Sequence, residues 1–296
     1  MKLLHPFVSF KKAIKPDICE KIISLGLATI NENKKKGIST EGKTFNEKHK
    51  KNNPSDKSKI LQNRTTSDKT NENIKLEGLN FSQLVVRDSE ICWLKDKFLY
   101  DLILPFIGKA NKEAGWNWNI ETGETLQFTV YHGKEKDGGF YGWHADGSSD
   151  FNNVIKPAIK ISDNPLKFKP PKKDSNNQFI KNINNQFIPD TDADDLPLKK
   201  DKSWLAPAFS IDEKKWGKVR KISMTLNLTD PKKYEGGNLK FDLGPHVKGD
   251  RYKICDDSRS QGSLIIFPSF TYHCITPVTS GTRYSLVFWC LGKPWQ

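Results

Sequence analysis

The distribution of apolar and polar positions predicts helices early in the chain and strands later. From residue 125 onward, apolar and polar residues alternate with period two in short runs, which Gly-, Asp- and Pro-rich turns separate. The predicted strands are 125–131, 140–146, 222–228, 238–242, 262–267 and 283–290. Helices followed by many short strands predict an α+β protein built around a β-sandwich or jelly roll.

Two helices are predicted before the strands, and the first of them follows a short strand. In residues 17–26 and 89–114, apolar residues recur at helical spacing. Pro16 and Asp17 are typical of a helix start, and Gly26 is typical of a helix end. Pro105 is expected to break or kink the second helix.

Two long polar tracts interrupt these elements. Residues 31–75 are rich in Lys, Asn, Glu, Ser and Thr, which predicts a weakly ordered segment. Residues 150–218 contain the sequence Asn-Asn-Gln-Phe-Ile twice, at 176–180 and 184–188, which indicates a local duplication. A loop of this length is typically disordered or a functional lid, and we predict a lid with aromatic contacts to a substrate. A solvated insertion without a role is the alternative.

Composition limits the classes of protein that the chain can belong to. Its 296 residues contain no apolar run long enough for a membrane-spanning helix, and no signal-peptide pattern. Five cysteines at irregular spacing do not predict a disulfide framework, and we expect a cytoplasmic protein. The net charge is +13, but only six of the 48 basic residues are arginine, the side chain that nucleic-acid readers favour. A nucleic-acid partner is therefore not favoured, and the oligomeric state stays open.

The motif His144-Ala-Asp146 carries the strongest chemical signal. Residues two apart on a strand point to the same face, so an imidazole and a carboxylate would lie side by side. His273 is the candidate for a third ligand. Two histidines and one carboxylate leave coordination positions open, which is the facial triad of non-haem Fe(II) oxygenases. A histidine beside an aspartate is by itself more often a packed or surface pair.

A basic residue follows the third candidate ligand on another predicted strand. Arg283, Ser285 and Trp289 alternate onto one face, where a guanidinium with a hydroxyl beside it could bind a dicarboxylic acid. Tyr131 ends an earlier strand and could donate a hydrogen bond to the same carboxylate. Arg220 is interpreted as ordering a strand end.

Several motifs together resemble the 2-oxoglutarate- and Fe(II)-dependent dioxygenases, specifically the prolyl 4-hydroxylase-like group that includes the PKHD-type hydroxylases. The resemblance covers about residues 80–150 and 219–295. It rests on motifs in a fixed order, namely Gln127-Phe-Thr-Val-Tyr131, Phe140-Tyr-Gly-Trp-His-Ala-Asp146, Arg220-Lys-Ile-Ser223, Glu235-Gly-Gly237, Gly262-Ser-Leu-Ile-Ile-Phe-Pro268, His273, Thr276-Pro-Val278 and Arg283. An arginine at 283, where collagen-type prolyl hydroxylases have lysine, favours the PKHD or oxygen-sensing branches.

The resemblance implies a double-stranded β-helix (jelly roll) with N-terminal buttressing helices. The whole chain, 1–296, would be a single domain. Its helical N-terminal region, residues 1–120, would hold the insertion 31–75, and its catalytic jelly roll, residues 121–296, would hold the insertion 150–218.

The resemblance also implies which residues form the site. His144, Asp146 and His273 would bind Fe(II), and Arg283, Tyr131 and Ser285 would bind the cosubstrate 2-oxoglutarate. The other implied reactant is O₂, with ascorbate as a candidate reductant. Trp289 and Leu239 are the candidate substrate-binding residues.

The function that the sequence predicts is hydroxylation of an unactivated C–H bond, with release of succinate and CO₂. The expected substrate is a prolyl or other residue of a peptide or protein. A small molecule, such as a free amino acid or a natural product, is the alternative. A nucleic-acid demethylase is disfavoured because Trp289 stands where AlkB-type enzymes carry a second arginine. A non-enzymatic jelly-roll binding protein is disfavoured by the complete triad together with Arg283.

Overall fold

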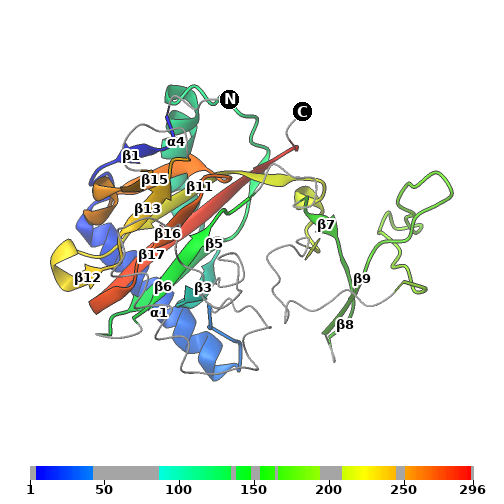
Figure 1. The fold of residues 1–296 in the computed structure, drawn as a ribbon. Coiled ribbons are helices and arrows are strands. Elements are labelled where there is room, and N and C mark those ends of the chain that lie inside the picture. Colours follow the sequence, from blue (N-terminus) through cyan, green and yellow to red (C-terminus); the bar gives the residue numbers. More distant parts are fainter. Residues whose placement is uncertain are drawn as a thin grey trace, which may run out of the picture.

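Two β-sheets pack face to face in the computed structural model of the chain (Figure 1). The structure describes residues 5–42, 87–134, 138–147, 154–163, 166–193, 209–244 and 251–294. Side chains from both sheets meet in one buried cluster, in which Tyr131, Ile265 and Phe267 come from the larger sheet and Leu239, Phe241 and Ile275 from the smaller. This arrangement is a jelly roll, one of the two architectures that the period-two pattern predicts.

The larger sheet has the strand order β1-β15-β11-β17-β5-β3, and β12 and β4 also pair with β17. Its strands are β1 (Val8–Phe10), β3 (Glu90–Leu94), β4 (Thr122–Gly123), β5 (Leu126–His132), β11 (Val219–Asn227), β12 (Tyr234–Gly236), β15 (Leu264–Pro268) and β17 (Val278–Gly292). The long strand β17 pairs antiparallel with both β11 and β5, so it runs through the centre of the sheet.

The smaller sheet has the order β14-β13-β16-β6-β2. Its strands are β2 (Arg87–Asp88), β6 (Phe140–His144), β13 (Leu239–Asp242), β14 (Tyr252–Ile254) and β16 (His273–Ile275). Strand β16 was not predicted from the sequence. Its pairing with β6 sets His273 directly opposite His144.

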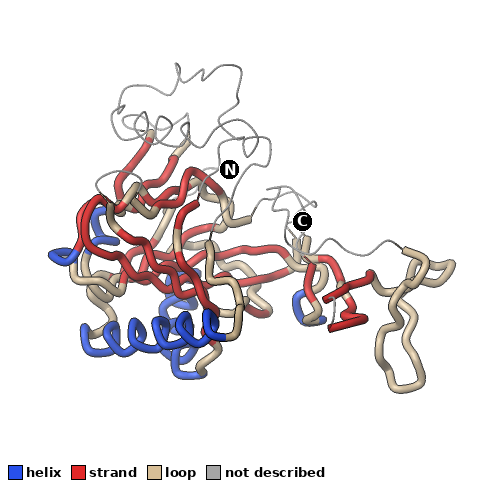
Figure 2. Tube along the Cα trace, turned by 90° about the horizontal axis from the view of Figure 1, so that it is seen from below, coloured by secondary structure: helices blue, strands red, loops and turns tan. Residues whose placement is uncertain are grey.

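Two α-helices, α1 (Pro16–Lys35) and α4 (Lys97–Glu113), lie on the outer face of the larger sheet among the described residues (Figure 2). Their buried residues join the same apolar cluster as Phe128, Leu226 and Leu286 of the sheet. None of the helices in the described ranges is long and apolar enough to span a membrane.

The first helix continues past the glycine that was predicted to end it. Gly26 lies inside α1, and a Cβ atom built there would come within 2.4 Å of the Phe128 ring. The glycine therefore permits a close approach of helix to sheet, and its role is packing rather than capping.

The second predicted helix is wrong over its first residues. Residues Glu90–Leu94 form β3, in which Cys92 and Leu94 are buried while Trp93 is 45% exposed, an alternation of period two. Helix α4 then passes through Pro105 without ending. A proline removes one backbone donor, and the buried apolar stripe that includes Ile103 and Ile107 holds the helix on the sheet.

The two faces of the larger sheet differ in chemistry. The outer face is apolar because it meets the helices. The inner face carries buried polar side chains, including Thr129, Ser223, Arg283 and Ser285, each at most 2% exposed. Since burying a polar group without a partner costs free energy, an inner face of this kind is typical of a binding cavity.

The insertion 150–218 contains strands β7 (Lys156–Pro157), β8 (Ile159–Asp163), β9 (Leu166–Lys169) and β10 (Phe209–Ser210). We call residues 166–193 the arm. In both views the arm protrudes from the jelly roll rather than lying across it (Figures 1 and 2). This arrangement gives no support to the predicted lid.

The duplicated sequence forms a unit of three similar turns within the arm. Ile180 N–H donates to the Lys172 carbonyl, Ile188 N–H to the Ile180 carbonyl and Lys172 N–H to the Ile188 carbonyl, at 2.8–3.1 Å, which closes a ring of positions eight residues apart. Two β-bridges, Lys173↔Phe179 and Lys181↔Phe187, make the first two turns. The bridge Pro171↔Pro189 joins the incoming and outgoing segments into the third.

The aromatic residues of the arm contact one another. Phe179 and Phe187 pack edge-to-face at 5.7 Å, and Phe187 lies 4.9 Å from the Trp216 ring. The indole N–H of Trp216 donates to the Ser210 carbonyl. These rings therefore attach the arm to its base, whereas the sequence analysis expected them to contact a substrate.

Candidate functional site

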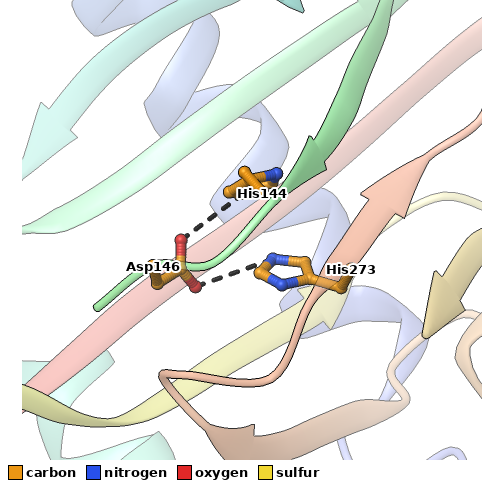
Figure 3. A group of neighbouring side chains, drawn as sticks. All are labelled: His144, Asp146 and His273. Atoms are coloured by element: carbon orange, nitrogen blue, oxygen red, sulfur yellow. Dashed lines mark ion pairs between the residues drawn. The ribbon is translucent and has the colours of Figure 1, made fainter. Parts of the chain in front are cut away.

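The three predicted metal ligands lie together at the inner edge of the smaller sheet (Figure 3). His144 ends β6 and His273 begins β16. Asp146 lies two residues beyond β6, so the predicted strand 140–146 is too long, yet its carboxylate still reaches both rings. Its Oδ1 lies 3.5 Å from Nε2 of His144, and its Oδ2 lies 3.7 Å from Nε2 of His273.

Hydrogen bonds from Nδ1 of the two histidine rings orient Nε2 of each ring toward Asp146. The Nδ1 atoms of His144 and His273 lie 2.8 and 2.9 Å from the backbone carbonyls of Gly142 and Thr271. A carbonyl oxygen can only accept, so Nδ1 must carry the proton in both rings. The Nε2 lone pairs then face Asp146, which is the tautomer that a metal requires.

The protonation states also suit metal binding. Burial, together with the neighbouring His144, lowers the pKa of His273 to about 4, so this ring is neutral at neutral pH. Burial opposes ionisation of Asp146, but His273, His144 and Arg220 outweigh it and hold the pKa of this carboxyl well below its usual range. Neutral imidazoles and an ionised carboxylate are the forms in which these groups bind metals.

The predicted carboxylate-binding arginine is buried on the inner face of the larger sheet. Arg283 is 2% exposed and stands directly opposite Tyr131 across β17 and β5. Its Nε has no hydrogen-bond partner within the described ranges, and its guanidinium lies 5.6 Å from the centre of the Tyr131 ring. A buried cationic side chain with an unpaired nitrogen is costly, which indicates that an anion binds beside Arg283.

The Gly236-Gly237 pair allows the Arg283 side chain to pack close to the backbone. Gly237 has φ +61°, and a Cβ built on it would lie 2.9 Å from Cδ of Arg283. Gly237 therefore leaves room for the Arg283 side chain.

The other predicted residues lie on the inner face of the larger sheet or in the apolar core. Ser285 is 1% exposed and shares the inner face with Arg283. Trp289 is 5% exposed, and its indole N–H has no partner among described residues. Leu239 lies on β13 in the apolar cluster that also contains Tyr131 and Phe241.

Two residues near the triad were missed. The Tyr141 ring stacks on His144 at 3.6 Å and 20°, and burial raises the pKa of this tyrosine to about 12. The Arg87 guanidinium lies 4.7 Å from the centre of the Tyr141 ring, and its Nη2 has no partner in the described portion of the chain. The scarcity of arginine was the available signal, because three of the six arginines, Arg87, Arg220 and Arg283, lie around the site.

Comparison with known proteins gives a family match over the C-terminal region of the chain. Residues 200–291 match the 2OG-Fe(II) oxygenase superfamily. A PKHD-type hydroxylase of Synechococcus sp. strain CC9605 is 40% identical over 70 residues, which cover 24% of this chain and 29% of the relative. The PKHD-type hydroxylase YbiX of Escherichia coli is 39% identical over 70 residues, which cover 23% and 27%. The alignments therefore span less than a third of these relatives.

Solved structures align over most of the chain, at low similarity. A viral collagen prolyl hydroxylase from Paramecium bursaria Chlorella virus-1 aligns over 98% of this chain and 97% of its own, with 12% identity and a TM-score of 0.45. A Pseudomonas putida prolyl-4-hydroxylase aligns over 97% and 92%, with 12% identity and a TM-score of 0.43. The sequence matches, rather than these alignments, carry the comparison: residues 200–291 match the 2OG-Fe(II) oxygenase superfamily, and about 70 residues of the chain are similar to PKHD-type hydroxylases.

Proposed function

We propose that this protein is an Fe(II)- and 2-oxoglutarate-dependent dioxygenase that hydroxylates an unactivated C–H bond, most simply on a prolyl residue of a peptide or protein. The proposal rests on two features of one jelly roll. Two imidazoles and one carboxylate lie close enough to bind one metal ion, and the same jelly roll buries Arg283, whose Nε has no partner among the described residues.

The donor set fits Fe(II). Two neutral nitrogen ligands and one carboxylate suit this metal and leave coordination positions for other ligands. His144, Asp146 and His273 would hold the metal, with Nδ1–H bonds to backbone carbonyls orienting the two rings. Bound Fe(II), with 2-oxoglutarate and O₂, would supply the oxidation that releases succinate and CO₂ and hydroxylates the substrate.

The inner face of the larger sheet offers hydrogen-bond donors suited to a dicarboxylic acid. Arg283 would bind the carboxylate of 2-oxoglutarate that lies farther from the metal, because its buried guanidinium offers parallel N–H donors. Tyr131, which stands opposite it, and Ser285, two residues along the same face, would add hydroxyl donors. Their burial excludes water from the charged pair, which strengthens the attraction.

The substrate would lie beside the cosubstrate. Trp289 shares the face of Arg283 and would contact the substrate, with its unpaired indole N–H as a donor. Leu239 would contribute apolar surface. We propose that residues 1–296 form one domain. Ascorbate is a candidate reductant for the iron. The similarity to PKHD-type hydroxylases supports a hydroxylation reaction. A peptidyl residue is the first candidate substrate, and a small molecule is the second.

The experiment is 2-oxoglutarate turnover with Fe(II), screened against proline-containing peptides, free amino acids and methylated oligonucleotides. We expect succinate production that depends on Fe(II) and is stimulated by a peptide. Stimulation by free amino acids alone would select the small-molecule alternative. No Fe(II)-dependent succinate production under any condition would refute the proposed activity.

A further inference from the structure

The three proposed metal ligands are not anchored in the same way. His144 and His273 belong to paired strands, stand opposite each other, and each has its ring fixed by a backbone carbonyl. Asp146 lies beyond the end of β6, outside the strand pairing. Its main chain must therefore be held by other contacts.

One of those contacts comes from Arg220 on β11. Its Nη1 donates to the backbone carbonyl of Asp146 at 3.2 Å. Its Nε and Nη2 donate to the two carboxylate oxygens of Glu124, at 2.5 and 2.7 Å, in a bidentate pair. The guanidinium also lies 4.0 Å from the centre of the Trp289 ring. Glu124 and Trp289 thus fix the plane of the guanidinium. The remaining nitrogen, Nη1, is directed at the Asp146 carbonyl.

A second contact acts on the next residue. Gly147 N–H donates to the Ser269 carbonyl at 2.9 Å, and a Cβ at Gly147 would lie 3.0 Å from Cβ of Arg220. The segment that carries Asp146 is therefore packed against Arg220 and tied to the loop that precedes His273. Because Gly147 bonds through its backbone, Arg220 provides the side-chain anchor that a substitution can remove.

We propose that Arg220, held in place by Glu124, is a positioning residue that sets the place of the Asp146 carboxylate and thereby the metal affinity of the site. This inference rests on the proposed function, since it assumes that Asp146 is a metal ligand. It assigns Arg220 a role in the site, whereas the sequence analysis assigned it to a strand end. Partners that orient metal ligands commonly change metal affinity 10- to 100-fold when they are removed.

The test measures metal binding rather than turnover. Mn(II) is titrated anaerobically into the full-length protein without 2-oxoglutarate, and free Mn(II) is followed by electron paramagnetic resonance. The variants are Arg220→Gln, Arg220→Lys and Glu124→Gln. Arg251→Gln is the matched control, because Arg251 forms the same bidentate pair with Asp242, at 2.7 and 2.7 Å, and its guanidinium lies over the Tyr252 ring rather than beside a proposed metal ligand.

We expect Arg220→Gln to weaken Mn(II) binding by about tenfold or more and Arg251→Gln to leave it within about twofold of the wild type. Arg220→Lys should bind within about threefold of Arg220→Gln, because one ammonium group cannot hold Glu124 and the Asp146 carbonyl with the geometry of the fork. The Mn(II) affinity of Glu124→Gln should lie between those of the wild type and Arg220→Gln. In this variant Arg220 keeps its charge but loses its ion pair with residue 124.

The outcomes separate this inference from the proposed function. Asp146→Ala must abolish Mn(II) binding, and if it does not, the metal site itself is wrong. If Asp146→Ala loses the metal while Arg220→Gln and Glu124→Gln bind like the wild type, only the positioning role is refuted. Restored affinity in Arg220→Lys would also refute it, because charge alone would then suffice. Circular dichroism checks folding, and Glu124→Gln tests the inference if Arg220→Gln does not fold.

Discussion

Replacing Arg283 by methionine should have opposite effects on the free protein and on its complex with 2-oxoglutarate. Arg283 is 2% exposed, and its Nε has no hydrogen-bond partner among the described residues. In the free protein it is a buried charge without a compensating anion, which is destabilising. Methionine keeps much of the side-chain volume and removes that charge. We therefore expect the free variant to be more stable than the free wild type, by about 1 kcal/mol or more.

The same substitution should weaken the binding of 2-oxoglutarate. Truncating one partner of a buried, hydrogen-bonded charge pair costs about 2–5 kcal/mol, so the dissociation constant for 2-oxoglutarate should rise roughly 30-fold or more. A ligand at 100 times its dissociation constant stabilises by about 2.7 kcal/mol. At the same concentration, the variant should gain less than about 1 kcal/mol.

Thermal unfolding with and without 2-oxoglutarate, in the presence of Mn(II), measures both effects. The Tm of the free variant should rise by about 2–4 °C, and the shift on adding 2-oxoglutarate should shrink. Arg259→Met is the matched control. Arg259 donates to the carbonyls of Gly236 and Tyr234 and to the Asn238 side chain, so its loss should lower the Tm. A free Arg283→Met protein that is destabilised like the control, or an unchanged 2-oxoglutarate affinity, would refute the reasoning.

Three further substitutions test other regions of the structure. Asp146→Ala should abolish Fe(II)-dependent succinate production, and retained production would exclude Asp146 as a ligand. Gly237→Ala should raise the apparent constant for 2-oxoglutarate several-fold, because the added Cβ would lie 2.9 Å from Cδ of Arg283; an unchanged constant in turnover assays would contradict this contact. Gly26→Ala should lower the free energy of unfolding in urea by about 1–2 kcal/mol, because overlap with the Phe128 ring outweighs the helix-forming gain of alanine; a more stable variant would show that helix and sheet separate freely.

The sequence predicted those features of the fold and site that depend on local spacing. The period-two runs indicated a β-sandwich or jelly roll, and the spacing in His144-Ala-Asp146 placed two side chains together even though Asp146 lies beyond its strand. His273 was found because a third ligand was chemically required. Its strand was not predicted, because three residues are too few to show an alternation of apolar and polar positions.

The misses have a common physical cause, which is contact between segments distant in sequence. Gly26 is locally typical of a helix end, yet the Phe128 ring packed against it decides its role. Cys92 and Leu94 alternate with the exposed Trp93 because β3 pairs with β5, and no local rule separates so short a strand from the helix that follows. The contact of Arg220 with the Asp146 carbonyl joins residues 74 positions apart.

The ring of hydrogen bonds in the arm limits how this insertion can change in evolution. In an open stack of repeats, a duplication adds one more unit at an end. Here the bonds among Lys172, Ile180 and Ile188 return to their starting residue, and the third turn is completed by the incoming and outgoing segments. One additional octapeptide would have to open the ring, and one fewer would leave it unclosed. The number of units in the arm is thus fixed by closure of the ring.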